Sequence, residues 1–145
     1  MSKFTYAVRR IIAALVITGA VLFGGSAIAH ADPVSWFDQW VGHDRSLQLS
    51  HDGTGTLVLG DGALNTDNWA VTWKKNPSDS ITITLQKLVS RSGPGMGHVG
   101  EQFFATIQPD SSGVPVLGMH QINPMRPGYT FCTLPELRAD PQCGA

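Results

Sequence analysis

Alternating side chains along residues 80–89 restrict the fold of this chain more than any other feature. From Ile81 to Leu85, bulky aliphatic residues alternate with threonine. A repeat of two residues is that of a β-strand with one buried and one exposed face. Leu88 has the opposite parity, which predicts a β-bulge near residues 86–87. We therefore expect a long strand in an all-β protein.

Five shorter segments also have strand-like patterns. They lie at residues 46–50, 56–59, 69–73, 102–108 and 114–120. Between the first two, Asp52-Gly53-Thr54-Gly55 predicts a hairpin turn with two glycines that can take a positive φ angle. Six strands joined mostly by turns predict a small antiparallel meander, either a barrel or a sandwich, which is lipocalin-like only by analogy of fold.

Helix is scarce in this sequence. Residues 35–41 can form a short amphipathic turn with three aromatic residues on its apolar side. Near the end of the chain, Thr133 and Glu136 have the spacing of a capping box, which predicts one or two helical turns between the two cysteines. Four prolines are expected to keep the rest of this tail irregular; they are Pro124, Pro127, Pro135 and Pro141.

The first 31 residues have the three-part plan of a secretory signal peptide. Basic residues precede an apolar run at 11–23, and Ala29-His30-Ala31 fits the small-x-small rule for cleavage. The run is shorter than the roughly 20 residues that span a bilayer, and the residues after Arg9-Arg10 match a twin-arginine signal poorly. We expect export by the general secretory pathway and removal of the helical signal peptide, residues 1–31. A single soluble domain would then remain at 32–145, with no stable membrane anchor.

Cys132 and Cys143 are the two cysteines of the chain. In a protein outside the cytoplasm such a pair usually forms a disulfide, which would stabilise a loop of this size by about 3 kcal/mol. The alternative is a metal site, which needs three or four converging ligands, and no histidine lies between the two thiols. We expect a structural disulfide.

The charge balance argues against a nucleic-acid partner. The whole chain has a formal net charge of −1, with 10 basic and 11 acidic residues. Lys3, Arg9 and Arg10 lie in the predicted leader, so the exported part keeps seven bases against all 11 acids, a formal charge of −4. Phosphodiesters and anionic lipid headgroups would repel such a chain.

The sequence has none of the common catalytic or cofactor motifs. It lacks a Gly-x-Ser-x-Gly elbow, an HExxH pair and a phosphate-binding glycine loop before a helix. We therefore assign no catalytic residue, no metal and no cofactor. The open alternative is a small hydrolase in which His43 or His98 acts as general base, assisted by Asp44 or Glu101.

The most distinctive polar cluster lies just ahead of the first expected strand. It contains Trp40, His43 and Arg45, and a guanidinium can hold a carboxylate or a phosphate. The glycine-rich loop at 93–100, which contains His98, can close over the same end of a barrel. We predict that a ligand site includes these four side chains. In the alternative, Arg45 pairs with a nearby acid and His43 caps the barrel end, so that the polar cluster is a structural plug.

Parts of the chain resemble small exported actinobacterial proteins, of the mycobacterial type, whose function is unknown. The resemblance rests on WVGHDRSL at 40–47, DGTG at 52–55, a terminal CGA and the junction AHADP at 29–33. It implies an extracytoplasmic β-protein. It implies no activity and no catalytic residues.

Four features favour a non-enzymatic binding or interaction protein of the cell envelope or the extracellular medium. They are the expected export, the β-scaffold, the four tryptophans and the lack of a catalytic constellation. Its partner would be a small apolar ligand or a cell-envelope or host protein. A structural component of the cell wall is a further alternative, and no sequence feature separates it from a binding protein.

Overall fold

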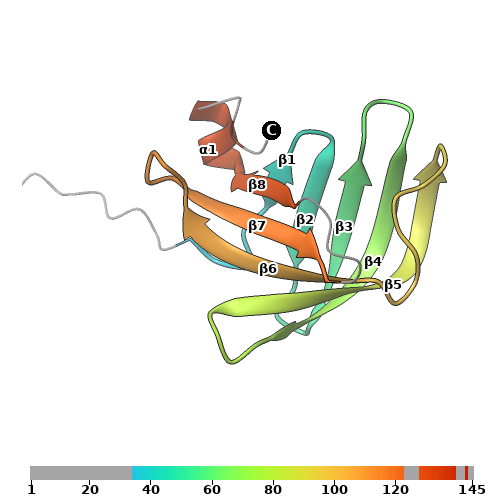
Figure 1. The fold of residues 1–145 in the computed structure, drawn as a ribbon, viewed down its shortest axis with the longest axis horizontal. Coiled ribbons are helices and arrows are strands. Elements are labelled where there is room, and N and C mark those ends of the chain that lie inside the picture. Colours follow the sequence, from blue (N-terminus) through green and yellow to red (C-terminus); the bar gives the residue numbers. More distant parts are fainter. Residues whose placement is uncertain (1–33, 123–127, 140–142, 144–145) are drawn as a thin grey trace, which may run out of the picture. The chain divides into compact units, whose positions relative to one another are not determined.

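The computed structural model describes residues 34–122, 128–139 and 143, and in them the chain forms a closed antiparallel β-barrel followed by one short helix (Figure 1). The prediction of an all-β antiparallel meander is confirmed, and the closed form is a barrel. The predicted signal peptide lies outside the described residues. The elements are β1 (Trp40–Gly42), β2 (Arg45–Leu49), β3 (Thr54–Gly60), β4 (Thr66–Lys75), β5 (Ser80–Ser92), β6 (Gln102–Pro109), β7 (Pro115–Gln121), β8 (Tyr129–Thr133) and α1 (Leu134–Ala139).

In the described part of the chain the barrel has eight strands, two more than the six that the sequence predicts. The two strands that were not predicted are β1 and β8, which pair with each other and close the barrel. Both are short, three and five residues, so neither contains enough alternation to be distinguished from a turn or a coil. The turn expected at 35–41 is present in its first half, whereas Trp40 and Val41 belong to a strand. Residues 35–38 form a single turn, closed by the Asp38 N–H donating to the Ser35 carbonyl at 3.1 Å, and the chain then enters β1.

The interior of the barrel is filled with large apolar side chains. Trp40, Trp69, Phe103 and Phe131 are almost fully buried, together with leucines and isoleucines from β2, β3 and β5. Burial of a side chain of this kind contributes about 1.5–3 kcal/mol relative to exposure. The stability of the barrel therefore rests on a packed core, and a binding site has to lie at its ends or on its outer surface.

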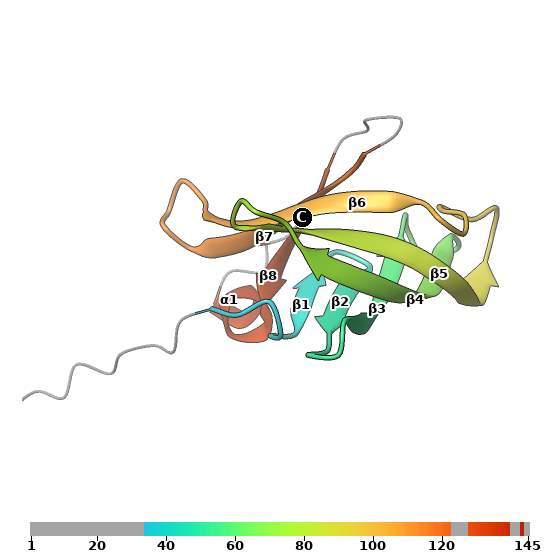
Figure 2. The same ribbon diagram turned by 90° about the horizontal axis from the view of Figure 1, so that it is seen from below.

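The long strand β5 contains the predicted bulge and a second irregularity. Val71 pairs with Leu85 and Ala70 with Lys87, so Gln86 is the extra residue, as the parity of Leu88 predicts. The second register shift lies between Asn68 and Trp69 on β4. Because a bulge increases local twist and bends the strand, the end of β5 turns away from β6 while it stays paired with β4 (Figure 2).

The end of β5 leaves an opening in the wall of the barrel. β6 begins at Gln102, opposite Thr84, so more than half of β5, residues 85–92, lies beyond the last residue pair with β6, and this part of the strand pairs with β4. One further pair of backbone hydrogen bonds extends the contact, because the Leu85 N–H donates to the Glu101 carbonyl and the Gly100 N–H to the Leu85 carbonyl. Beyond that point the β5–β6 loop occupies the place of a strand.

The β2–β3 hairpin uses its two glycines for different reasons. Gly53 has a φ of +84°, as the turn prediction requires. Gly55 lies within β3, where a Cβ atom would come to 2.5 Å from the Gln48 carbonyl oxygen. The expectation that both glycines would serve positive φ angles is therefore wrong for Gly55, which permits a close approach of two strands.

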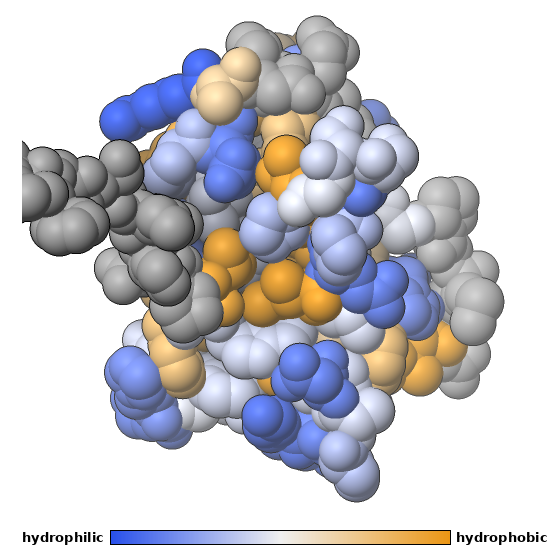
Figure 3. Space-filling view, turned by 90° about the vertical axis from the view of Figure 1, so that its left-hand side faces the viewer, coloured by the Kyte–Doolittle hydropathy of each residue, from blue (hydrophilic) through white to orange (hydrophobic). Residues whose placement is uncertain are grey.

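The segment before β1 covers one end of the barrel. Phe37 stacks on His51 with ring centroids 3.6 Å apart and meets Trp73 edge-on at 5.7 Å. The Trp73 indole N–H donates to the Ser50 carbonyl at 2.9 Å. The β4–β5 and β6–β7 turns lie on this side, where apolar side chains gather at the centre and hydrophilic ones border them (Figure 3).

The predicted disulfide is confirmed. Cys132 on β8 is bonded to Cys143, with Cα atoms 6.0 Å apart. The helix α1 begins directly after Thr133, inside the disulfide loop, as the capping-box spacing predicts. Of the predicted irregular tail, Pro124, Pro127 and Pro141 lie outside the described residues. Within the described part of the chain, no helix has the length and apolar character needed to cross a bilayer.

Candidate functional site

In an antiparallel meander of eight strands, the β1–β2, β3–β4, β5–β6 and β7–β8 connections lie at one end of the barrel and the other three connections at the opposite end. The β1–β2 turn, which contains His43, and the β5–β6 loop, which contains His98, therefore lie at the same end. The sequence predicts that these two segments share one end. Whether a ligand binds there depends on which side chains face an accessible space.

The side chains of Trp40, His43 and Arg45 lie in different surroundings. Trp40 is a core residue with no exposed surface, between Leu47 on β2 and Thr133 on β8. The side chain of His43 is 80% exposed. Arg45 extends from β2, where its Nε donates to the His43 carbonyl at 2.9 Å.

Arg45 also contacts an aromatic ring. Its guanidinium carbon lies 5.5 Å from the centroid of the Tyr129 ring, a distance typical of a cation–π contact. The guanidinium is thus held by contacts within the protein. The partners of Arg45 are thus a carbonyl and an aromatic ring and not the acid that the alternative interpretation expects, and the exposed His43 does not cap the barrel.

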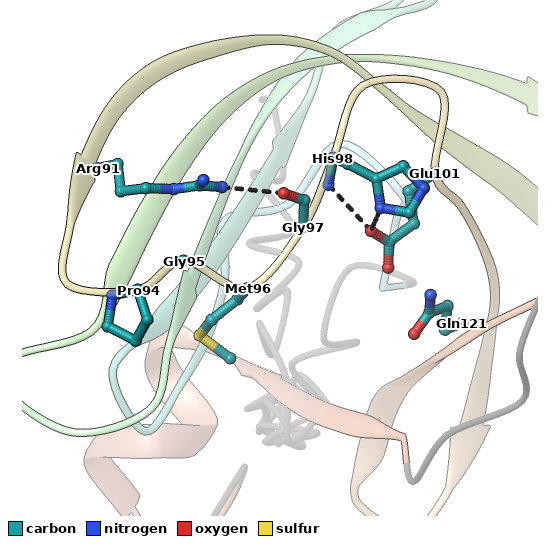
Figure 4. Close-up of a pocket in the computed structure, with 8 residues that line it drawn as sticks. All are labelled: Arg91, Pro94, Gly95, Met96, Gly97, His98, Glu101 and Gln121. Carbon is teal, nitrogen blue, oxygen red and sulfur yellow. Dashed lines mark hydrogen bonds and ion pairs between the residues drawn. The ribbon is translucent and has the colours of Figure 1, made fainter.

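An open pocket of about 290 Å³ lies at this end of the barrel, beneath the β5–β6 loop (Figure 4). Of the four side chains predicted to bind a ligand, His98 is the one that lines it. Its lining is formed by Arg91, Pro94, Gly95, Met96, Gly97, His98, Glu101 and Gln121. The volume is close to the lower limit for sites that hold small molecules.

A buried ion pair anchors the loop over the pocket. Asp67 on β4 has no exposed surface and accepts two hydrogen bonds from the Arg91 guanidinium, both at 2.7 Å. It also accepts the backbone N–H of Met96 at 2.8 Å. The Arg91 guanidinium, followed by the Met96 N–H, holds the pKa of the Asp67 carboxyl below its ordinary value. The indole N–H of Trp69 acts weakly in the same direction, at a geometry poorer than that of a normal hydrogen bond.

The anchor extends into the loop through one of the two guanidinium nitrogens that bind Asp67. Arg91 Nη2 donates to the Gly97 carbonyl at 2.9 Å. Gly95 takes a φ of +92°, and a Cβ atom there would collide with the Arg91 guanidinium. At Gly97 a Cβ atom would come to 2.8 Å from a methyl group of Leu85. The glycines of this loop therefore permit close packing against the arginine and the barrel core.

His98 and Glu101 form a hydrogen-bonded pair at the pocket. His98 Nδ1 lies 3.0 Å from Glu101 Oε2, and the His98 backbone N–H donates to the same oxygen at 3.1 Å. The Glu101 side chain is 4% exposed, whereas that of His98 is 74% exposed. A carboxylate only accepts hydrogen bonds, so the proton lies on Nδ1 and the solvent-facing Nε2 of a neutral imidazole is an acceptor.

The pair has the chemistry of an oriented base and of a polar contact for a ligand. The residues that line the pocket include no serine, threonine or cysteine, so this part of the chain supplies no side-chain nucleophile next to His98. The described residues also contain no group of three or more histidine, cysteine or acidic side chains that would hold a metal ion.

Sequence reasoning missed Asp67, Arg91 and Gln121. For Asp67 a signal exists, because it shares the parity of Trp69 and Val71 and therefore points into the barrel. A charged side chain at an inward position needs a partner. The partner, Arg91, lies 24 residues away, and the two bulges in β5 determine that the side chains meet.

No family model, curated protein or solved structure matches this chain.

Proposed function

We propose that this protein is an exported, non-enzymatic binding protein whose ligand occupies the pocket beneath the β5–β6 loop. The observation that supports this proposal best is the construction of the pocket. A buried ion pair and tightly packed glycines fix a loop that presents a histidine and a buried carboxylate to a space that the Gln121 residue of β7 also lines. Such polar groups on a rigid scaffold are typical of sites that select a small ligand.

The filled core supports a polar ligand at the mouth of the barrel. Trp40, Trp69, Phe103 and Phe131 occupy the interior where a lipocalin-like barrel would hold an apolar molecule. The pocket is open to solvent and is lined mainly by polar groups and glycine backbone. We therefore favour a small polar ligand over the apolar ligand expected from the sequence.

Export is part of the same proposal. The disulfide between Cys132 and Cys143 is consistent with a compartment outside the cytoplasm, where such bonds persist. The leader at residues 1–31 and the resemblance to exported actinobacterial proteins point the same way. Expression of the full chain in an exporting bacterium tests it, since the exported protein should begin at Asp32. An unprocessed chain retained with the cells would contradict this part.

Backbone amide NMR tests the binding site. The purified, isotope-labelled protein is titrated with amino acids, sugars, amino sugars and small carboxylates, each up to about 10 mM. A ligand of the pocket should shift the amides of residues 95–101 and 121, and His98→Ala or Gln121→Ala should weaken its binding at least about fivefold.

His43→Ala and Arg45→Ala are matched controls at the same end of the barrel. Both should retain binding, because neither side chain lines the pocket. Shifts centred on residues 43–45, with binding lost in these two variants, would transfer the site to the polar cluster predicted from the sequence. If no compound shifts the pocket amides, the proposed function is wrong for this part of the molecule.

A small hydrolase remains a second candidate because His98 is oriented by a buried carboxylate. In such a reaction His98 Nε2 would take a proton from water as the water oxygen attacks an ester carbonyl, and the imidazolium would return the proton to the leaving alcohol. Hydrolysis of p-nitrophenyl acetate by the wild type and by His98→Gln tests this. Equal rates for the two proteins would exclude the hydrolase.

A further inference from the structure

The net charge of the pocket is not obvious from the residues that line it. Arg91 lines the pocket, but its guanidinium is bound on two nitrogens to the buried Asp67 carboxylate and donates also to the Gly97 carbonyl. The ion pair with Asp67 neutralises the charge of the arginine, and the donors of Nε and Nη2 are used on groups of the protein. Arg91 is therefore poorly placed to attract an anion.

Glu101 supplies the remaining formal charge. Its side chain is 4% exposed, and its backbone is fixed, because the carbonyl accepts from Leu85 at 2.9 Å and the N–H donates to His98 at 3.1 Å. One oxygen, Oε2, accepts the His98 backbone N–H and also lies 3.0 Å from His98 Nδ1. The carboxylate projects from the loop toward the side of the pocket where Gln121 lies (Figure 4).

A carboxylate this deeply buried is costly unless a cation or several donors compensate it. In the structure its compensation consists of a backbone N–H and the Nδ1–H of an exposed imidazole. When that imidazole is neutral, the pocket has one net negative charge and a further acceptor at His98 Nε2. A ligand with a positively charged nitrogen and hydrogen-bond donors complements both groups.

We propose that the ligand of this pocket is a small organic ammonium compound, whose charged nitrogen binds to the Glu101 carboxylate. This inference rests on the proposed function, because it takes the pocket to be a ligand site. The volume of about 290 Å³ sets the size class, that of an amino alcohol, an amino sugar or a single amino-acid side chain. His98 and Gln121 then contact the polar groups next to the nitrogen.

Three probes of equal length test the role of charge: 1,5-pentanediol, 5-amino-1-pentanol and 1,5-diaminopentane. Each is titrated into the purified protein at constant ionic strength, and binding is measured from the amide shifts of residues 97, 98 and 101. We expect the two amines to bind at least about tenfold more tightly than the diol, because a charge-assisted hydrogen bond to a buried carboxylate is much stronger than a neutral one.

Glu101→Gln should reduce this preference for amines to about twofold or less, while the shape of the pocket and the hydrogen bonds to His98 are retained. Asp79→Asn is the matched control: it removes the same charge from an exposed turn, where the side chain is 88% exposed, and the preference should persist. A well-dispersed amide spectrum verifies that each variant is folded.

Two results would overturn the inference. If amines and diol shift the pocket amides with equal affinity, the pocket binds small molecules without selecting a cation, and the proposed function survives. If none of the three probes shifts these amides while another compound of the wider titration does, the ligand class is wrong and the pocket assignment stands. The comparison of probes on the wild type decides the matter even if Glu101→Gln does not fold.

Discussion

At the scale of single residues, Asp67 links the core of the barrel to the candidate site. It is the inward-pointing charge of β4, and its partners are the Arg91 guanidinium and the backbone of the loop above the pocket. A buried carboxylate with two short hydrogen bonds from one guanidinium has a well-defined geometry. The same residue therefore contributes to the stability of the fold and to the position of His98.

We predict that Asp67→Asn destabilises the protein by about 2–3 kcal/mol at pH 7. The loss should be smaller than for a fully buried pair, since the Arg91 side chain is 33% exposed. The pKa of Asp67 is lowered in the folded protein, so this stabilisation is present above the pKa of the unfolded chain, about 4, and disappears as the pH falls further.

Urea unfolding at pH 7 and pH 3 measures both effects. The free energy of unfolding of the wild type should fall more between these pH values than that of Asp67→Asn. Asp79→Asn, in an exposed turn, should behave like the wild type. Equal pH dependence in the wild type and in Asp67→Asn would contradict the role assigned to the ion pair.

Arg45 allows the two interpretations of the polar cluster to be separated. Its contacts are the His43 carbonyl and the Tyr129 ring, so Arg45→Ala should lower stability by up to about 1 kcal/mol. Binding at the pocket should be unchanged. Thermal unfolding and the amide titration together test this, and unchanged stability with lost binding would restore the cluster as a ligand site.

At the scale of elements, strands with sufficient alternation could be predicted from the sequence, and β5 could be predicted with its bulge. β1 and β8 could not, because three and five residues show too little of a repeat of two. The site depends on long-range geometry. The loop and His98 were identified, but the meeting of Asp67 with Arg91 follows from the register of β4 against a twice-bulged β5.

The β5–β6 loop gives a prediction that separates backbone strain from packing. Gly62 and Gly95 both have positive φ angles, +76° and +92°. A Cβ atom at Gly62 would meet nothing within 4 Å, whereas one at Gly95 would collide with the Arg91 guanidinium. Gly62→Ala should therefore cost about 1 kcal/mol through strain alone.

Gly95→Ala should cost about 1 kcal/mol more than Gly62→Ala and should also shift the amides of Met96 and His98, because the arginine must move. Chemical denaturation and amide spectra of the two variants provide the measurement. Equal costs, with the loop amides unmoved, would mean that the packing of Gly95 against Arg91 does not hold the loop in place.

At the scale of the whole molecule, the barrel depends on its shortest seam. β1 and β8 are joined through two pairs, Trp40 with Thr133 and Val41 with Cys132. The disulfide begins within this seam, and α1, which lies in the disulfide loop, packs against both strands. The pair of strands with the fewest paired residues is thus the one that contains a cysteine of the disulfide. The disulfide is therefore placed to stabilise closure of the barrel as well as the tail.

Reduction of the disulfide should lower the free energy of unfolding by about 3 kcal/mol, the amount expected for a loop of this length. We expect β1 and β8 to open first, because this seam has the fewest residue pairs. Amide hydrogen exchange should therefore accelerate at residues 40–42 and 129–133 more than in the long β3–β4 pair. Hydrogen exchange followed by mass spectrometry, with and without reductant, measures the pattern.

The double variant Cys132→Ser/Cys143→Ser is the control for effects of the reductant, and it should show the same pattern in untreated protein. A uniform increase over all strands would mean that the disulfide stabilises the barrel only globally, through the unfolded state, and that the β1–β8 seam is no weaker than the other strand pairs.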